Sequence, residues 1–210
     1  MQRKAVQRFS TRFFALWLLL TCLVTLPVRA TVLLELGFEE LVAQSGFIFV
    51  GTAIDHRTAA QGEQLYTFVS FNVEEVVKGA APADTVELRF LGGDAEDAGL
   101  KVEGQFIPDA GMRGVFFVTG LDELQVNPLT GWQQGYFPLV ADDSGVDYLD
   151  MRQRPDLAIP GLEVEPLVSK MLGMGFSTEA IDAKFPKAFL FSLDDFRAAI
   201  VDEASRGAAP

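Results

Sequence analysis

Hydrophobic and polar residues alternate in two segments of the first half of the chain, residues 69–73 and residues 85–90. A period of two is the spacing of a β-strand that buries one face and exposes the other. The pattern therefore predicts two half-buried strands. Their buried side chains should be Val69, Phe71, Val73, Val86, Leu88 and Phe90.

Two other segments are apolar without interruption, FIFV at residues 47–50 and VFFV at residues 115–118. Short apolar runs of this length are typical of buried strands. Gly51 follows the first run and predicts a bend in that strand. A break in the alternation at Glu74-Glu75 predicts a β-bulge in the strand that follows Leu65.

The expected loops and turns separate these strands. Residues 56–64 are polar and contain a glycine, and residues 94–111 are long, acidic and irregular in pattern, so both are predicted as loops. Residues 124–126 and 136–140 are predicted to form a hairpin around the stretch between them. Residues 142–145, Asp-Asp-Ser-Gly, should form a turn that leads into a short strand near Tyr148.

The expected helices lie toward the two ends of the chain. Residues 34–44 carry apolar side chains at helical spacing, and Ser45-Gly46 should end that helix. A second short helix is expected at residues 167–172, after a proline-punctuated linker. A third should begin at Ser192, because a serine followed three residues later by an acidic residue, here Asp195, is the arrangement of a helix N-cap.

These elements predict a mainly β fold. Five or six short strands with a bulge, a glycine bend and a flanking helix suggest a small OB-like Greek-key barrel. Residues 31–155 would form the barrel with its N-terminal helix. Residues 156–210 would form a helical extension that packs on the barrel.

Residues 1–30 have the pattern of a secretory signal peptide. Four basic residues precede an apolar run from Phe13 to Leu26, and small residues surround a cleavage site expected between Ala30 and Thr31. The run is shorter than a membrane-spanning helix requires, so we expect no stable membrane insertion after cleavage. The protein is therefore expected to be secreted or periplasmic.

Cleavage at that position would leave a strongly acidic chain. Five of the 17 Lys and Arg residues precede Thr31, so 12 would remain against 29 Asp and Glu, a formal charge of −17. Such a surface repels nucleic acid and anionic lipid headgroups. A cation, a basic protein or a neutral polymer is a more compatible partner, although acidity also serves solubility alone.

The order of several short motifs resembles a known family. FVGT at residues 49–52, YTF at 66–68, VEEVVKG at 73–79 and VEL at 86–88 resemble secreted bacterial domains that are similar to the OB-fold of tissue inhibitors of metalloproteinases and netrin-like modules. GWQQGYF at residues 131–137 resembles an element that closes many of them. The resemblance implies an OB-like barrel that binds an exported protein or peptide. The inhibitors use an N-terminal cysteine, whereas the expected N-terminus here is Thr31.

Candidate chemistry is sparse. The single cysteine, Cys22, lies in the signal segment, and His56 is the one histidine, so we expect no catalytic site of the thiol or Ser-His-Asp type, no metal site and no cofactor. Asp143-Ser144-Gly145 matches a short signature of aspartic proteases but is interpreted as a turn. A hydrolase that uses carboxylates remains an alternative to a binding domain.

The best binding candidates lie within GWQQGYF. Trp132, Gln133, Gln134 and Tyr136 could form a platform of rings and amides for a peptide or, as the second possibility, a glycan or cell-surface polymer. OB barrels use faces and rim loops of this kind to hold ligands. The structural alternative is that Trp132 packs on the barrel as part of a hairpin.

Overall fold

A computed structural model describes residues 34–207, apart from residues 63, 81–82, 96–97, 101, 103 and 122–124. The expected cleavage site at Ala30 and Thr31 lies outside the described residues. Within the described part of the chain, none of the helices is both long and apolar enough to cross a membrane.

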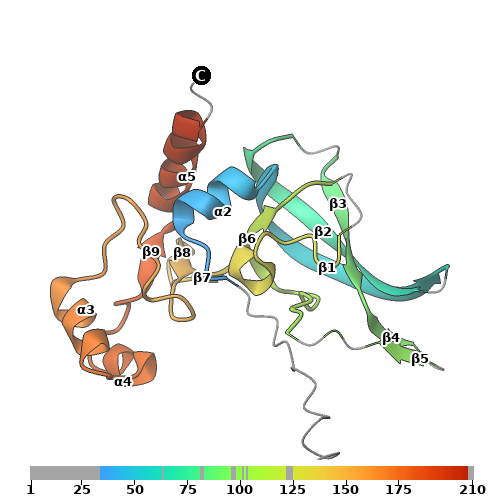
Figure 1. Ribbon diagram of the computed structural model, residues 1–210. Coiled ribbons are helices and arrows are strands. Elements are labelled where there is room, and N and C mark those ends of the chain that lie inside the picture. The colour runs from blue at the N-terminus through green and yellow to red at the C-terminus, as the bar shows by residue number, and fades with distance from the viewer. Residues whose placement is uncertain are drawn as a thin grey trace, which may run out of the picture. The chain divides into compact units, whose positions relative to one another are not determined.

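The fold is mainly β, as the alternating pattern predicts. Seven antiparallel strands form one sheet in the order β3-β2-β1-β6-β7-β8-β9 (Figure 1). These strands are β1 (Phe47–Gln61), β2 (Gln64–Lys78), β3 (Thr85–Leu91), β6 (Arg113–Val118), β7 (Tyr136–Ala141), β8 (Asp147–Asp150) and β9 (Leu190–Ser192). A separate short pair consists of β4 (Gly93–Ala95) and β5 (Ala98–Leu100).

Helices complete the structure on one side of this sheet. They are α2 (Phe38–Gln44), α3 (Pro166–Gly173), α4 (Thr178–Asp182) and α5 (Leu193–Gly207), with a 3₁₀ turn, η1 (Trp132–Gly135), before β7. Residues from Leu34 onward form one compact unit. Helix α5 contacts α2 and the strands β2, β8 and β9, so it is integrated into the fold.

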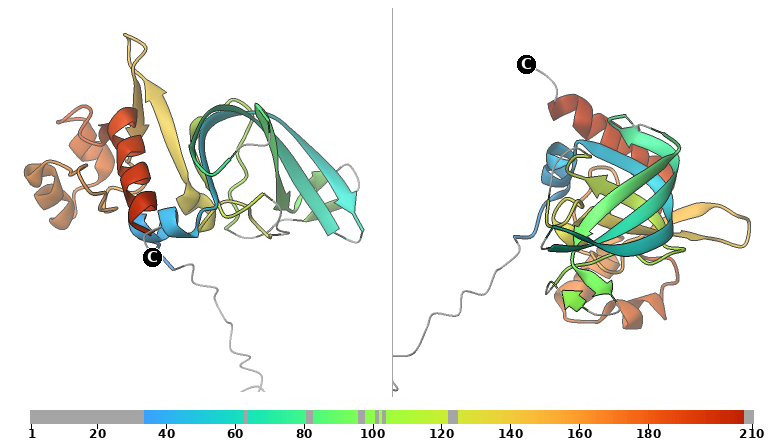
Figure 2. Two further views of the ribbon diagram at one scale, coloured as in Figure 1. Left: turned by 90° about the horizontal axis from the view of Figure 1, so that it is seen from above. Right: turned by 90° about the vertical axis from the view of Figure 1, so that its right-hand side faces the viewer.

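Strands β1, β2, β3 and β6 have the connectivity of a Greek key. The first three are consecutive neighbours, and β6 returns after a long connection to lie beside β1. The resulting order, fourth-first-second-third, defines that motif. These four strands curl around a shared interior (Figure 2).

The continuous apolar runs are explained by burial of both faces of β1 and β6. On β1, Phe49 joins a core inside the curl of the sheet, whereas Ile48 and Val50 join a second core beneath the helices. On β6, Phe116 and Phe117 divide in the same way. Because each face meets its own core, neither strand has polar positions between its apolar ones.

The inner core confirms the alternation of β2 and β3. The side chains predicted to be buried there lie inside, apart from Val73, which is partly buried at its margin. Aromatic rings dominate this core. Phe71 packs edge-on against Phe116 with ring centroids 4.8 Å apart, and against Phe49 at 5.7 Å.

The first helix is shorter than the sequence predicted. It begins at Phe38, and Leu34 lies before it with 80% of its surface exposed. The helix begins there because the Glu40 carboxylate, on its first turn, accepts a hydrogen bond of 2.9 Å from the backbone N–H of Gly37. Phe38, Leu41 and Val42 are buried, as the helical spacing predicted.

The predicted loop at residues 56–64 is wrong. β1 continues to Gln61 and pairs with β2 as far as Gln64, so a long two-stranded arm replaces most of the loop. Its residues are polar because the arm extends beyond the core, as their exposure indicates. The predicted bulge is confirmed, because Val50 pairs with Glu75 and Gly51 with Val73, which leaves Glu74 without a partner on β1.

The predicted hairpin between residues 124–126 and 136–140 is also wrong. Leu124 lies outside the described residues, and the carbonyl of Val126 accepts from the N–H of Leu91 on β3. β7 pairs instead with β6 on one side and β8 on the other. The turn at residues 142–145 is confirmed and connects β7 to β8, forming a hairpin that projects from the sheet (Figure 2).

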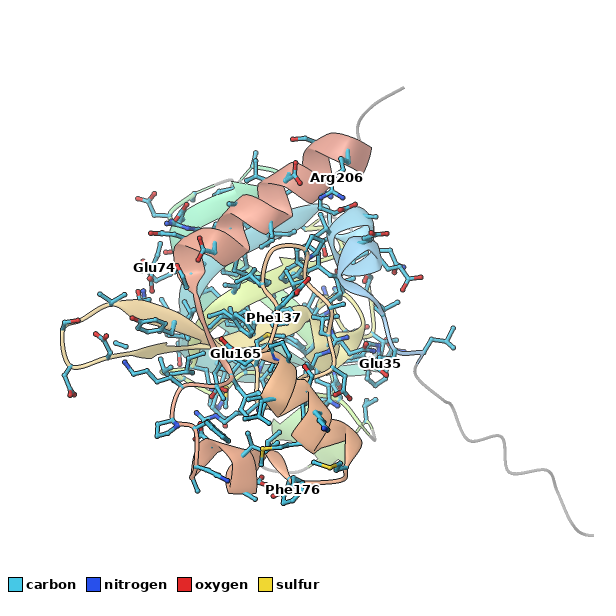
Figure 3. The ribbon with its side chains drawn as sticks, turned by 90° about the vertical axis from the view of Figure 1, so that its left-hand side faces the viewer. Glu35, Glu74, Phe137, Glu165, Phe176 and Arg206 are labelled. Atoms are coloured by element: carbon cyan, nitrogen blue, oxygen red, sulfur yellow. The ribbon has the colours of Figure 1, made fainter. Side chains whose placement is uncertain are left out.

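Toward the C-terminus the predicted helices at residues 167–172 and from Ser192 are confirmed as α3 and α5. The hydroxyl of Ser192 accepts from the N–H of Asp195 at 3.4 Å, which is the expected cap. Phe196 and Ile200 of α5 are fully buried, and the Phe196 ring packs against Phe38 of α2 and against Phe137 of the sheet, which Figure 3 labels. Helix α4 and strand β9 were not predicted.

Candidate functional site

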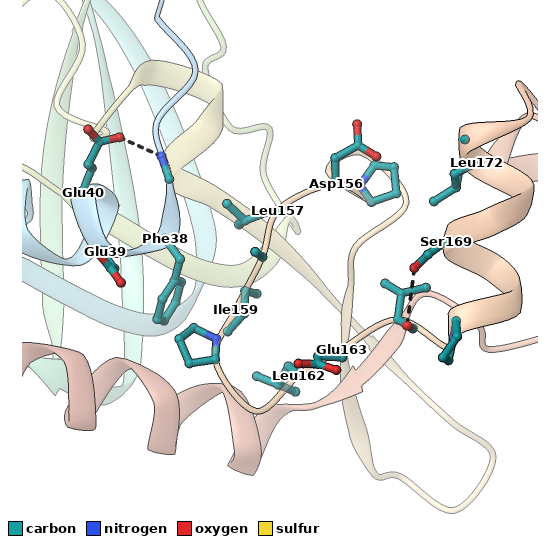
Figure 4. A pocket seen from close by; sticks show the side chains of 17 residues that line it. Phe38, Glu39, Glu40, Asp156, Leu157, Ile159, Leu162, Glu163, Ser169 and Leu172 are labelled. Atoms are coloured by element: carbon teal, nitrogen blue, oxygen red, sulfur yellow. Dashed lines mark hydrogen bonds between the residues drawn. The ribbon is translucent and has the colours of Figure 1, made fainter.

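A groove of about 1320 Å³ lies on the helical side of the fold, among the residues that the structure describes. The first turn of α2 forms one wall, α3 forms the opposite wall, and residues 155–164 form the floor between them. Figure 4 shows Phe38 on the first wall, Leu172 and Ser169 on the second, and Leu157, Ile159 and Leu162 between them.

Prolines shape the floor of this groove. Pro155 and Pro160 lie in the segment between β8 and α3, and Pro166 begins α3 at a position where a missing N–H costs nothing. The segment folds back on itself through a bridge between Ile159 and Leu162, both of which are anchored in the helix-side core. The floor is therefore a loop held in place by this bridge, with an apolar side that faces the core.

The charged side chains that line the groove are all acidic. Glu39 and Glu40 come from α2, and Asp156 and Glu163 come from the floor. Glu40 is engaged with the N–H of Gly37, whereas Asp156 and Glu163 are exposed. No lysine or arginine is among the described lining residues.

The backbone before α2 is held in place by two side chains. Gln134 accepts from the Leu36 N–H at 2.8 Å through Oε1 and donates to the Leu34 carbonyl at 2.9 Å through Nε2. Arg154 donates to the Leu36 carbonyl at 2.6 Å and to the Gln134 carbonyl at 3.4 Å. We call these two residues the clamp. It fixes the chain as it enters the first wall of the groove at Gly37.

The structure separates the four residues predicted to form one platform. The amide of Gln134 is already used in the clamp. Tyr136 is half-buried in the inner core, where its ring stacks on Phe106 at 5.1 Å and on Phe116 at 5.0 Å. Burial raises the pKa of the Tyr136 phenol, and its hydroxyl donates to the Arg113 carbonyl.

Trp132 and Gln133 remain available at the surface. Gln133 is exposed and Trp132 is half-exposed. Trp132 has a φ of +62°, in the left-handed region, which costs a residue with a side chain about 1–2 kcal/mol. Strain of this kind is concentrated at functional sites. A contact surface at Trp132 and Gln133 therefore stays a prediction.

Every polar residue of the VEEVVKG motif has a structural contact. Glu74 binds Arg113, and Glu75 binds Arg197 of α5. The Lys78 ammonium donates to the carbonyls of Val42 and Ser45, at 2.6 and 2.7 Å, and so satisfies the C-terminal end of α2. The motif therefore links the sheet to α2 and α5.

Gly79 completes this motif for a steric reason. Its φ is +84°, and a Cβ at this position would lie 2.4 Å from the carbonyl oxygen of Gly46. A side chain is therefore excluded where the end of β2 passes the start of β1. Packing and hydrogen bonding within this fold therefore explain the VEEVVKG motif.

A second, smaller hollow contains a cluster of ion pairs. Arg113 lies between Glu74 and Asp147 and donates to both oxygens of each carboxylate at 2.6–3.0 Å. Hydrogen bonds from Arg113 lower the pKa of Glu74 and of Asp147. A general acid in a hydrolase needs a raised pKa, which neither carboxylate has.

The remaining candidate residues are distributed separately. Asp143, Ser144 and Gly145 lie in the turn between β7 and β8, where Asp142 accepts from the Ser144 and Val146 N–H groups. His56 is exposed on β1. Within the described part of the chain, no three His, Cys, Asp or Glu side chains are grouped as metal ligands.

Sequence reasoning missed the groove. Its walls come from residues 37–40 and 155–173, which are far apart in the chain. The prolines at 155, 160 and 166 were the available signal, and they were interpreted as a linker. Comparisons of the chain with protein-family models, with curated proteins and with solved structures found no match.

Proposed function

We propose that this protein is an exported, non-catalytic binding domain that holds a polypeptide segment in the groove between α2 and α3. The signal-like residues 1–30 support export. The Greek-key order of β1, β2, β3 and β6 supports an OB-like barrel as the framework, since OB-folds are partly open Greek-key barrels that present ligands on faces and loops.

The observation that carries the proposal is the groove itself. An apolar floor between two helical walls suits a peptide, because extended or helical segments place apolar side chains into such grooves at regular spacing. The floor is built on the helix-side core, and the clamp fixes the chain that enters the first wall, so the site is largely preformed. A preformed site reduces the entropy cost of binding.

The composition of the groove favours a peptide over a glycan. Sugar rings stack on exposed aromatic rings, but Phe38, the one aromatic residue among the described lining residues, is only 2% exposed. Glycan binding is the second candidate function and would use Trp132 and Gln133. Loss of polysaccharide binding in Trp132→Ala with unchanged peptide binding would assign it to that surface.

The test is selection of binders from a phage-displayed library of random peptides on the chain from Thr31 onward. Enriched peptides are then measured against Ser169→Trp, which fills the groove from an exposed position on α3. Ser205→Trp is the matched control, because Ser205 is exposed on α5 and does not line the groove.

We expect Ser169→Trp to weaken binding at least about tenfold, or about 1.4 kcal/mol, while Ser205→Trp leaves it unchanged. Both variants should unfold at the temperature of the parent protein. If no enriched peptide distinguishes the two variants, the groove is not a polypeptide site.

A further inference from the structure

We propose that the groove selects a cationic polypeptide segment, one in which lysine or arginine side chains are interspersed with apolar ones. This inference rests on the proposed function and names the class of ligand for the same site. It is drawn from the charged side chains of the groove and from the ion pairs and hydrogen bonds that the arginine side chains outside it already make.

The acidic side chains of the groove floor are not neutralised within the protein. Asp156 and Glu163 have neither an ion pair nor a side-chain hydrogen bond among the described residues. They flank the apolar floor residues Leu157, Ile159 and Leu162 in the chain. The floor therefore offers apolar contact with free carboxylates beside it.

Three arginines outside the groove are paired with other groups. Arg154, which precedes the floor, donates to the carbonyls of Leu36 and Gln134. Arg152 binds Asp150 and Asp182, and Arg206 binds Asp202 and Glu203. Neither these arginines nor Lys170 of α3 line the groove, so the described lining residues provide no cation to Asp156 and Glu163.

A ligand that alternates basic and apolar side chains fits both the apolar floor and the unpaired carboxylates beside it. The aliphatic part of a lysine or arginine side chain can pack on the apolar floor while its charged end reaches the carboxylate of Asp156 or Glu163. Apolar residues between the cations would contact Leu157 and Leu172. An acidic segment would meet like charges on the α2 wall and on the floor, which costs affinity and discriminates against it.

The test uses three synthetic twelve-residue peptides that share the same leucine and proline positions. The other positions are all lysine in the first peptide, all serine in the second and all glutamate in the third. Affinities are measured by fluorescence anisotropy at low and at moderate salt. We expect the lysine peptide to bind at least about tenfold more tightly than the serine peptide, and the glutamate peptide to bind most weakly.

Two matched double variants separate the groove from the overall acidity of the chain. Asp156→Asn with Glu163→Gln removes the free charges of the groove. Asp143→Asn with Asp195→Asn removes two exposed charges outside it. Both variants change the net charge equally, so long-range attraction is matched between them.

We expect the groove variant to lose about three- to tenfold in affinity for the lysine peptide, and the control variant less than twofold. The loss should shrink as salt is raised, because exposed charges are screened. Equal losses in the two variants would mean that the peptide responds to net charge alone, and would overturn the inference.

The two proposals fail in different ways. If the serine or glutamate peptide binds as well as the lysine peptide and Ser169→Trp abolishes that binding, the groove is a polypeptide site but not a cationic one. If Ser169→Trp affects none of the three peptides, and none of the enriched library peptides, both proposals are wrong.

Discussion

The two faces of strands β1 and β6 differ in what covers them. The inner face packs against the same curled sheet, through rings such as Phe49, Phe71 and Phe116. The outer face packs against α2, α5 and the segment that forms the groove floor, through Ile48 and Phe117 among others. One core is therefore built by strands alone, and the other by strands and helices together.

This difference assigns the candidate site to one face. A core made of a sheet curled on itself leaves no wide opening between elements, whereas helices and loops that pack on a sheet can leave a groove at their margin. The groove lies at such a margin, where Ile159, Leu162 and Phe38 belong to the helix-side core and also line the opening. Substitutions in the two cores should separate stability from binding.

The largest effect is expected in the inner core. Phe71→Ala removes a fully buried ring that contacts Phe49 and Phe116, and should lower the free energy of unfolding by about 3–5 kcal/mol. Urea denaturation measures the change. Phe68→Ala, on the opposite face of β2 and half-exposed, is the control and should cost about 1 kcal/mol or less. Similar losses in both would contradict the division of β2 into buried and exposed faces.

A somewhat smaller loss is expected in the helix-side core. Ile200→Ala on α5 removes a fully buried side chain and should cost about 2–4 kcal/mol. The adjacent Val201 is 51% exposed, so Val201→Ala should change stability by less than about 0.5 kcal/mol. Thermal and urea unfolding would test both. If Ile200→Ala were silent, α5 would not be part of the core.

The clamp should contribute less than either core. Gln134→Ala removes two hydrogen bonds to the segment before α2, and should cost about 1 kcal/mol because one bond is exposed and the other is only partly buried. Gln133→Ala, at the preceding residue, should leave the free energy of unfolding nearly unchanged, because Gln133 is exposed. Hydrogen exchange of the Leu36 amide should speed up in the first variant only. Equal protection in both variants would show that the clamp does not hold this segment.

The smallest effect concerns pH. The folded-state pKa values of Glu74 and Asp147 are lowered by Arg113, so their contribution is present above about pH 4.5 and is lost as the pH falls through those lowered values. Arg113→Met should remove about 1 kcal/mol or less at pH 7, because the groups are partly exposed. The stability difference from the parent protein should shrink toward pH 2.

Arg89→Met is the control for this pH effect. The Arg89 guanidinium donates to the amide oxygen of Gln61 rather than to a carboxylate. Its stability difference from the parent protein should therefore stay constant between pH 7 and pH 2. A difference for Arg113→Met that does not change with pH would mean that its loss comes from packing.

Much of the fold could be predicted from local patterns. The alternation of β2 and β3, the apolar runs of β1 and β6, the bulge at Glu74 and the N-cap at Ser192 all reflect short-range constraints on the backbone. The errors arose where pairing overrode composition. Residues 56–61 are polar yet form a strand, because β2 supplies hydrogen-bond partners beyond the edge of the core.

The groove was not predicted from the sequence. The stretch from Gly131 to Phe137 was singled out instead, and within it Trp132 has a φ angle in the left-handed region. The four residues were grouped into a platform because they are neighbours in the sequence. In the structure, Gln134 belongs to the clamp and Tyr136 packs in the inner core. Identical neighbours, Gln133 and Gln134, have different surroundings because a turn points successive side chains in different directions.

The sequence by itself determined the apolar and alternating strands, the helices α2, α3 and α5, and which of their side chains leave water, because periodicity and capping act within a few residues. Only the tertiary structure decided that β1 and β6 serve two cores, that Lys78 caps α2, and that residues 37–40 meet residues 155–173 around a groove. Each of these contacts joins segments distant in the chain. Their geometry depends on sheet order and helix packing, which no local pattern encodes.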